Sequence, residues 1–162
     1  MIVWSRNVKL TWKDFTGKVP EHAEHDAFTV YNIKVKTAPK ADSAYITLFA
    51  WFDKKASWVK KGKNTDYLLS HEQFHFNIAE WFARKTRANL KSEKFTAKNI
   101  NKRLGEIVNA NHAEMEKTRA NYDLETNHSQ VKVKQDEWEK KITAQIELLK
   151  VVSDTLVKIK LQ

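Results

Sequence analysis

Residues 68–81, LLSHEQFHFNIAEW, have the pattern of a long helix, the first that the chain contains. Apolar side chains recur here every three to four residues, which is the period of one helix face. The stripe consists of Tyr67, Phe74, Ile78, Trp81 and Phe82. Asn64 or Thr65 can cap the N-terminus, and an aspartate at the next position suits the first turn. The pattern therefore predicts a helix from Asp66 to Leu90.

Two histidines lie on the same stripe. His71 and His75 are separated by about 6 Å of rise and about 40° of rotation along a helix, so their imidazoles can converge on one ion. With Glu72 they form the pattern His-Glu-x-x-His, in which the histidines bind zinc and the glutamate acts as general base on the zinc-bound water. Two buried core histidines are the alternative, but their polar nitrogens would need partners. Glu80 is expected to face away from the ion, as a solvated or supporting residue.

The chain before residue 64 shows the alternation that is typical of strands. AFTVYNIKVKT, residues 27–37, alternates in polarity, and SAYITLFAWF, residues 43–52, is apolar on both faces, as a strand covered on both sides would be. IVW (residues 2–4) and KLTWKDFTG (residues 9–17) are expected to be further strand or strand-edge material. Between them lies a polar loop, EHAEHDA (residues 21–27), whose His22 and His25 we expect to be solvated.

Two further segments after the first helix also have apolar residues at the helical period. It predicts helices at Ala97–Asn121 and Val131–Val152, and the final TLVKIKLQ alternates like a last strand. We therefore predict one α+β domain over residues 1–162, with strands mainly in 1–64, helices mainly in 65–152, and a return to the sheet in 153–162. The expected architecture is a small N-terminal antiparallel or mixed sheet of about three to five strands, packed on about three long helices, as in zincins.

Composition narrows the chemistry. The chain has 29 Lys and Arg, 20 Asp and Glu, and no Cys. Without Cys, disulfides and thiolate zinc ligands are excluded, so a metal site must use His, Asp or Glu. The scattered lysines and the absence of known nucleic-acid-binding motifs disfavour nucleic acid as a partner. No segment approaches the ~20 apolar residues of a membrane span. The start, MIVWSRNVKLTW, lacks a signal-peptide pattern, which leaves the cytoplasm or a mature exported form.

A catalytic zinc needs a third protein ligand and an open position. The metzincin extension fails because Ile78 and Trp81 stand where Gly and His are required. The second predicted helix offers Glu106, Glu114, Glu116 and His112. The next segment, RANYDLETNHSQ (residues 119–130), is expected to form a polar loop between helices, and it offers Tyr122, Asp123, Glu125, Thr126 and His128. The residues by themselves leave these alternatives open.

Four blocks of the chain resemble one bacterial domain family. They are Trp-x-Asp-Phe at Trp12–Phe15, His-Glu-x-x-His-Phe at His71–Phe76, Tyr-Asp-x-x-Thr-x-His at Tyr122–His128 and Gln-x-x-Trp at Gln135–Trp138. Over nearly the whole chain, this combination is similar to domains of unknown function that are regarded as secreted zinc-dependent proteases. The resemblance implies His128 as the third zinc ligand and a periplasmic or secreted location. Ser129 stands where we expect Gly in many members.

The functional prediction is a zinc-dependent hydrolase of peptides or proteins. Zn²⁺ is expected to be held by His71, His75 and His128, with Glu72 as the catalytic general base. A strand beside the zinc helix, at residues 45–53, is expected to align an extended peptide by backbone pairing. Two alternatives are a non-catalytic zinc-binding domain, whose site four protein ligands would close, and a basic interaction module with incidental histidines.

Two neighbours of the site have expected supporting roles. Asp123 or Thr126 is expected to hold a ligand imidazole through its second nitrogen. Tyr122 is expected either to donate to a developing oxyanion or to pack at the end of the second helix.

Overall fold

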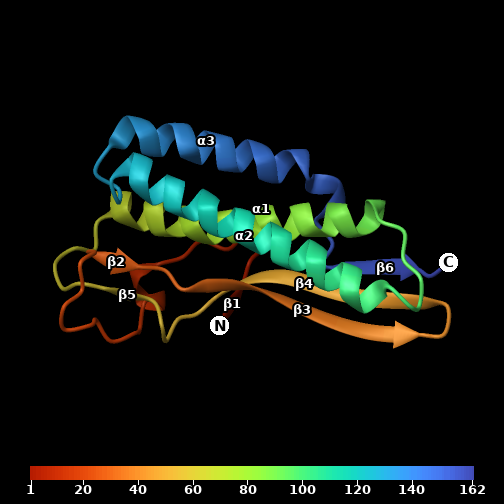
Figure 1. Ribbon diagram of the computed structural model, residues 1–162. Coiled ribbons are helices and arrows are strands. Elements are labelled where there is room, and N and C mark those ends of the chain that lie inside the picture. The colour runs from red at the N-terminus through yellow and green to blue at the C-terminus, as the bar shows by residue number, and fades with distance from the viewer.

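The computed structural model describes residues 1–162, and its helices lie together on one face of a β-sheet (Figure 1). The helices are α1 (Asp66–Ser92), α2 (Ile100–Thr126) and α3 (Lys132–Leu148), followed by a 3₁₀ turn, η2 (Lys150–Val152). The sheet consists of β1 (Ile2–Val3), β3 (Tyr31–Lys40), β4 (Ser43–Phe52) and β6 (Leu156–Lys160). This α+β architecture confirms the fold class that the change of hydrophobic period predicts. None of the helices has the length and apolar character needed to cross a bilayer.

β4 is the central strand of an antiparallel sheet. It pairs with β3 along its whole length and with β1 and β6 along its other edge. Its inward-facing side chains are fully buried, and they are Ile46, Leu48, Ala50 and Phe52. The predicted last strand is confirmed as β6, which returns the C-terminus to the sheet. A separate two-stranded sheet joins β2 (Ala27–Phe28) to β5 (Trp58–Val59).

α1 is the helix on which the rest of the molecule is assembled, because it contacts β4, α2 and α3. It begins as predicted, since the Thr65 side chain accepts a hydrogen bond from the Leu68 backbone N–H at 3.2 Å. Phe76, Ile78 and Phe82 are completely buried on it. Burying each such side chain stabilises the fold by about 1.5–3 kcal/mol. Neighbours on several sides explain why polar residues of α1 are also buried.

Glu80 is buried, which corrects the first of its two expected roles, that of a solvated residue. Its Oε1 accepts hydrogen bonds from Arg84 Nε at 2.8 Å and from Arg87 Nη2 at 2.7 Å. Arg87 is itself fully buried and donates to the Leu48 carbonyl at 3.1 Å. Because a buried charge is costly unless it is paired, this group of three charges is a structural link between α1 and β4.

Two other local expectations are wrong. Residues 9–17 form no strand and instead contain a short 3₁₀ helix, η1 (Trp12–Asp14), because Thr11 and Asp14 form a capping box. α2 continues to Thr126, so residues 122–126 are helical and do not belong to a loop.

β4 also differs from its expected environment. No second layer covers its outer face, where Tyr45, Thr47, Phe49 and Trp51 are half-exposed. Both of its edges are already paired, so β4 cannot align a peptide by adding a strand. β3 pairs only with β4, so the outer edge of β3 is free.

Candidate metal centre

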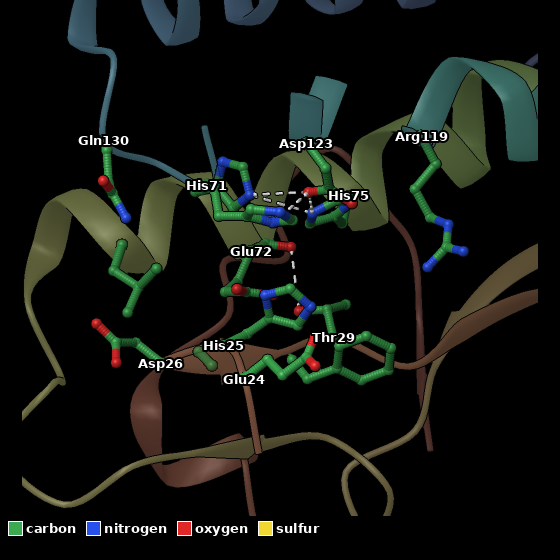
Figure 2. Close-up of a pocket in the computed structure, with 14 residues that line it drawn as sticks. Glu24, His25, Asp26, Thr29, His71, Glu72, His75, Arg119, Asp123 and Gln130 are labelled. Atoms are coloured by element: carbon green, nitrogen blue, oxygen red, sulfur yellow. Dashed lines mark hydrogen bonds and ion pairs between the residues drawn. The ribbon is translucent and has the colours of Figure 1, made fainter. Parts of the chain in front are cut away.

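Three side chains from two helices meet at one point (Figure 2). His75 Nε2 lies 2.9 Å from Asp123 Oδ1, and His71 Nε2 lies 3.3 Å from the same oxygen. The two Nε2 atoms are 3.2 Å apart. Both imidazoles are buried, and Asp123 is half-buried at the pocket wall. The helical spacing therefore brings the two rings together as expected, and the last turn of α2 supplies the third group.

The chemistry of this donor set fits zinc. In a tetrahedral site with metal–ligand distances of about 2.0–2.1 Å, ligand atoms are separated by about 3.3 Å. The three observed separations of 2.9, 3.2 and 3.3 Å lie close to that value. Two neutral imidazoles whose Nε2 lone pairs face each other repel, and a cation between them removes that repulsion. Nδ1 of His71 and of His75 has no hydrogen-bond partner within the protein, so no contact fixes the tautomer of either ring, and both can present Nε2 to a metal.

Glu72 lies beside the cluster and is almost completely buried. Its Oε2 has no hydrogen-bond partner, while the Thr29 hydroxyl donates to its backbone carbonyl at 3.4 Å. Burial raises the pKa of the Glu72 carboxyl above its usual value, although His71 and Thr29 oppose the shift. A carboxylate with a raised pKa is suited to take up a proton near neutral pH.

Burial also raises the pKa of Asp123, but in the metal-free protein Nε2–H of His71 and of His75 can donate to its carboxylate. These hydrogen bonds lower the pKa more, so the net pKa is well below the usual value. Asp123 therefore carries a negative charge at neutral pH. Burial lowers the pKa of His71, which keeps its ring neutral and available as a metal ligand. The cluster thus combines two imidazole nitrogens with one anionic oxygen.

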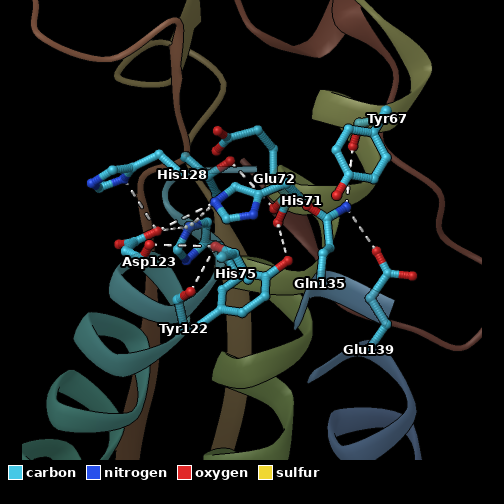
Figure 3. Close-up of polar contacts among 11 residues, drawn as sticks. Tyr67, His71, Glu72, His75, Tyr122, Asp123, His128, Gln135 and Glu139 are labelled. Carbon is cyan, nitrogen blue, oxygen red and sulfur yellow. Dashed lines mark hydrogen bonds and ion pairs between the residues drawn. The ribbon is translucent and has the colours of Figure 1, made fainter. Parts of the chain in front are cut away.

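Tyr122 packs behind the cluster and does not face it. Its ring stacks on His71 with centroids 4.5 Å apart and meets His75 edge-on at 5.1 Å. Its hydroxyl donates to the His71 backbone carbonyl at 3.4 Å (Figure 3). Of the two expectations for Tyr122, the structure shows the packing role. The Thr126 hydroxyl donates to the Tyr122 carbonyl at 2.6 Å, so it holds no imidazole.

His128 lies outside the group of three. It follows the end of α2, is substantially exposed, and places Nδ1 3.7 Å from Asp123 Oδ1, on the other side of that carboxylate from the histidine pair (Figure 3). Its ring packs on His25 with centroids 4.3 Å apart. Asn127, His128 and Ser129 all have positive φ, at 45°, 50° and 69°. The Gly expected at 129 from the family resemblance is the residue that this backbone favours.

The remaining sequence candidates lie elsewhere. Glu114 pairs with Lys85, and Glu116 pairs with Arg119. Glu106 pairs with Arg103, and His112 is exposed and joins no cluster of metal-ligating residues. Among His, Asp and Glu side chains, only His71, His75 and Asp123 form such a cluster. Asp123, which the sequence left as one alternative, therefore has the position that the geometry requires of a third ligand, while the role expected for His128 stays a prediction.

α3 holds the site from behind. Gln135 is fully buried and donates to the Tyr67 carbonyl at 3.3 Å, near the start of α1. Trp138 donates from Nε1 to Glu125 Oε2 at 3.0 Å and packs against Tyr122. Three of the four sequence blocks, those on α1, α2 and α3, therefore meet around the cluster of His71, His75 and Asp123.

A pocket of about 180 Å³ opens onto the cluster. Its lining includes His71, Glu72, His75, Asp123, His128, Arg119 and the segment from Glu24 to Thr29. Sequence reasoning missed His25, which we expected to be solvated, because nothing in a polar loop shows that β2 and β5 will carry it to the pocket. Arg119 was also missed, although its spacing of four residues from Asp123 is a signal that the two share one face of α2.

Comparisons with known proteins identify no relative: no protein-family model, curated protein or solved structure matches this chain.

Proposed function

We propose that this protein is a zinc-dependent peptide hydrolase whose metal is held by His71, His75 and Asp123. The observation that supports the proposal best is the meeting of two imidazole Nε2 atoms and one carboxylate oxygen at separations of 2.9–3.3 Å beside the buried Glu72. Two histidines and one carboxylate are a known catalytic zinc set, and the pocket leaves room for water and substrate.

Glu72 is the proton carrier in this proposal. Zinc, when bound, lowers the pKa of a coordinated water and polarises a carbonyl group. The unpaired Oε2 of Glu72 takes a proton from the attacking water, and the same carboxyl then gives it to the leaving amine. Burial supports both steps because it raises the pKa of Glu72 towards neutral pH.

β3 is the strand that we propose for alignment of an extended peptide. It has a free edge, whereas β4 has none. Its first residue, Tyr31, lies close to the cluster, with ring centroids of Tyr31 and His75 6.3 Å apart. Thr29, two residues earlier, lines the pocket. A peptide paired with this edge would run past the metal cluster.

The test combines metal analysis with cleavage of casein and a peptide library. The wild-type protein is expected to carry one zinc per chain and to cleave some of these substrates. Glu72→Gln should keep the zinc and lose about 10²–10⁴-fold in activity. Glu114→Gln, the same change on an exposed part of α2, should keep both the zinc and the activity. Wild-type protein that binds no zinc, or that binds zinc and cleaves nothing on a broad panel, would overturn the proposal.

A further inference from the structure

The outer face of the main sheet is strongly basic. The helices cover only the opposite face (Figure 1). The exposed lysines of the four strands are Lys34, Lys36, Lys40, Lys158 and Lys160. In the register of the sheet they belong to the same face, since Lys34 and Lys36 lie opposite Phe49 and Thr47, and Lys158 lies opposite Tyr45. The four strands contain no acidic residue.

These lysines have no anionic partner in the protein. The ion pairs involve other lysines and arginines, and none of the five takes part in one. Two of them lie over the Tyr45 ring, with Nζ 4.9 Å (Lys40) and 5.7 Å (Lys158) from its centroid. Asp42 and Asp154 lie next to the strands in sequence, and their side chains accept hydrogen bonds from the Ser43 hydroxyl and from the Leu156 backbone N–H. The face therefore presents uncompensated positive charge.

The same face carries partly exposed apolar side chains. Tyr45, Phe49 and Trp51 of β4 are half-exposed between the lysines. Val3, opposite Trp51, is 41% exposed, and Leu156, opposite Thr47, is 45% exposed. The hydrophobic core is formed by the other row of β4 side chains, and the outer row does not belong to it. Exposed apolar groups of this kind mark an interaction surface.

We propose that this face binds the surface of a lipid bilayer that contains anionic phospholipids. Lysines attract anionic headgroups, and aromatic and aliphatic side chains between them suit the boundary between headgroups and acyl chains. A single-stranded nucleic acid would also use lysines and stacked rings, but exposed aliphatic residues such as Val3 and Leu156 would serve no purpose there. None of the residues that line the metal pocket lies on this face, so the inference does not depend on the proposed hydrolase activity.

The size of the effect follows from the charges. Each lysine near an anionic membrane strengthens binding about five-fold at moderate ionic strength. Salt at 1 M shortens the screening length to about 3 Å and should release the protein if these contacts dominate. Loss of three lysines should weaken binding about 100-fold.

The experiment is co-sedimentation of the full chain with vesicles of phosphatidylcholine and of phosphatidylcholine with 30% phosphatidylglycerol. The protein is expected to bind only the anionic vesicles and to leave them at high salt. The variant Lys34→Gln/Lys36→Gln/Lys158→Gln should lose about 100-fold in partition coefficient. Lys117→Gln/Lys132→Gln/Lys140→Gln removes the same charge from exposed, unpaired lysines of the helices and should bind nearly as well as wild type.

A second pair of variants tests the apolar part of the face. Leu156→Ser should weaken binding about ten-fold, whereas Leu148→Ser, at a 72%-exposed position on α3, should not. If the two lysine variants lose the same amount in partition coefficient, net charge alone attracts the protein to the vesicles, and the proposal is overturned. Failure to bind anionic vesicles would overturn it too, as would binding of a single-stranded oligonucleotide through the same lysines in place of vesicles.

Discussion

His75 Nε2 on α1 lies 2.9 Å from Asp123 Oδ1 in the last turn of α2. The third member of the cluster therefore comes from a helix that packs directly against α1, and not from a mobile connection. Helix packing sets such a position more rigidly than a loop would, which suits a metal ligand.

Variants of Asp123 and His128 should separate the two candidates for the third ligand. Asp123→Ala should weaken zinc binding by at least about 100-fold, because it removes the only anionic member of the cluster. His128→Ala should keep full zinc occupancy, since His128 is exposed and lies outside the cluster, against Asp123 and the His25 ring. Competition titration with a chromogenic chelator measures both. The reverse pattern would restore His128 as the ligand.

Glu72→Gln should stabilise the metal-free protein at pH 8. The folded-state pKa of Glu72 is raised, so its contribution to stability is present below the usual pKa of 4.5 and is lost as pH rises through the folded value. At pH 8 a buried, unpaired carboxylate remains, and its removal should raise the free energy of unfolding by about 1–3 kcal/mol. Urea unfolding with EDTA checks this. Glu114→Gln removes the same charge and should change the free energy of unfolding by less than about 0.5 kcal/mol.

The metal-free Glu72→Gln protein should lose stability as pH falls below about 6.5. The folded-state pKa of His71 is lowered, so its contribution is complete above its usual pKa of 6.5 and is lost as pH falls. Asp123, whose pKa is also lowered, adds a further loss below its usual pKa of 3.8. Urea midpoints measured at pH 8, 6 and 5 should decrease in that order. A midpoint that stays constant across this range would contradict a buried neutral His71.

Ser129→Gly should stabilise the turn after α2. Ser129 has φ of 69°, a backbone conformation that costs a residue with a Cβ about 1–2 kcal/mol. Glycine relieves that cost but adds entropy to the unfolded chain, so we expect a gain of about 0.5–1 kcal/mol. Ser153→Gly is the matched control, because φ there is −69°, and it should lose stability. Thermal unfolding of both variants decides; a lower melting temperature for Ser129→Gly would contradict the strain.

Arg87→Met should destabilise the fold strongly. Arg87 is fully buried, and its loss leaves Glu80 with Arg84 as its only charged partner and frees the Leu48 carbonyl. Breaking a buried ion pair from one side costs about 3–5 kcal/mol, which urea unfolding can measure. Arg103→Met, in a partly exposed group with Glu93 and Glu106, should leave the urea midpoint nearly unchanged. Equal midpoints for the two variants would mean that the buried group of charges is not structural.

Much of the fold was predictable because it depends on local periodicity. α1 begins at the expected Asp66, and β4 and β6 follow the alternation in the sequence. Residues 9–17 were mistaken for a strand because a capping box, and not periodicity, determines their shape. The end of α2 was placed too early because the polar residues 122–126 read as a loop, whereas contacts with α1 and α3 keep them helical.

A spacing of four residues has the same geometry in every α-helix, so the primary structure alone places His71, Glu72 and His75 in one region of a helix. Which distant group joins them depends on how the helices pack. Asp123 and His128 are five residues apart, and the packing of α2 on α1 brings Asp123 into the cluster and leaves His128 at the pocket wall. Likewise, alternation cannot show which strand faces are covered. The outer face of the sheet is exposed and basic because all three helices pack on the other face.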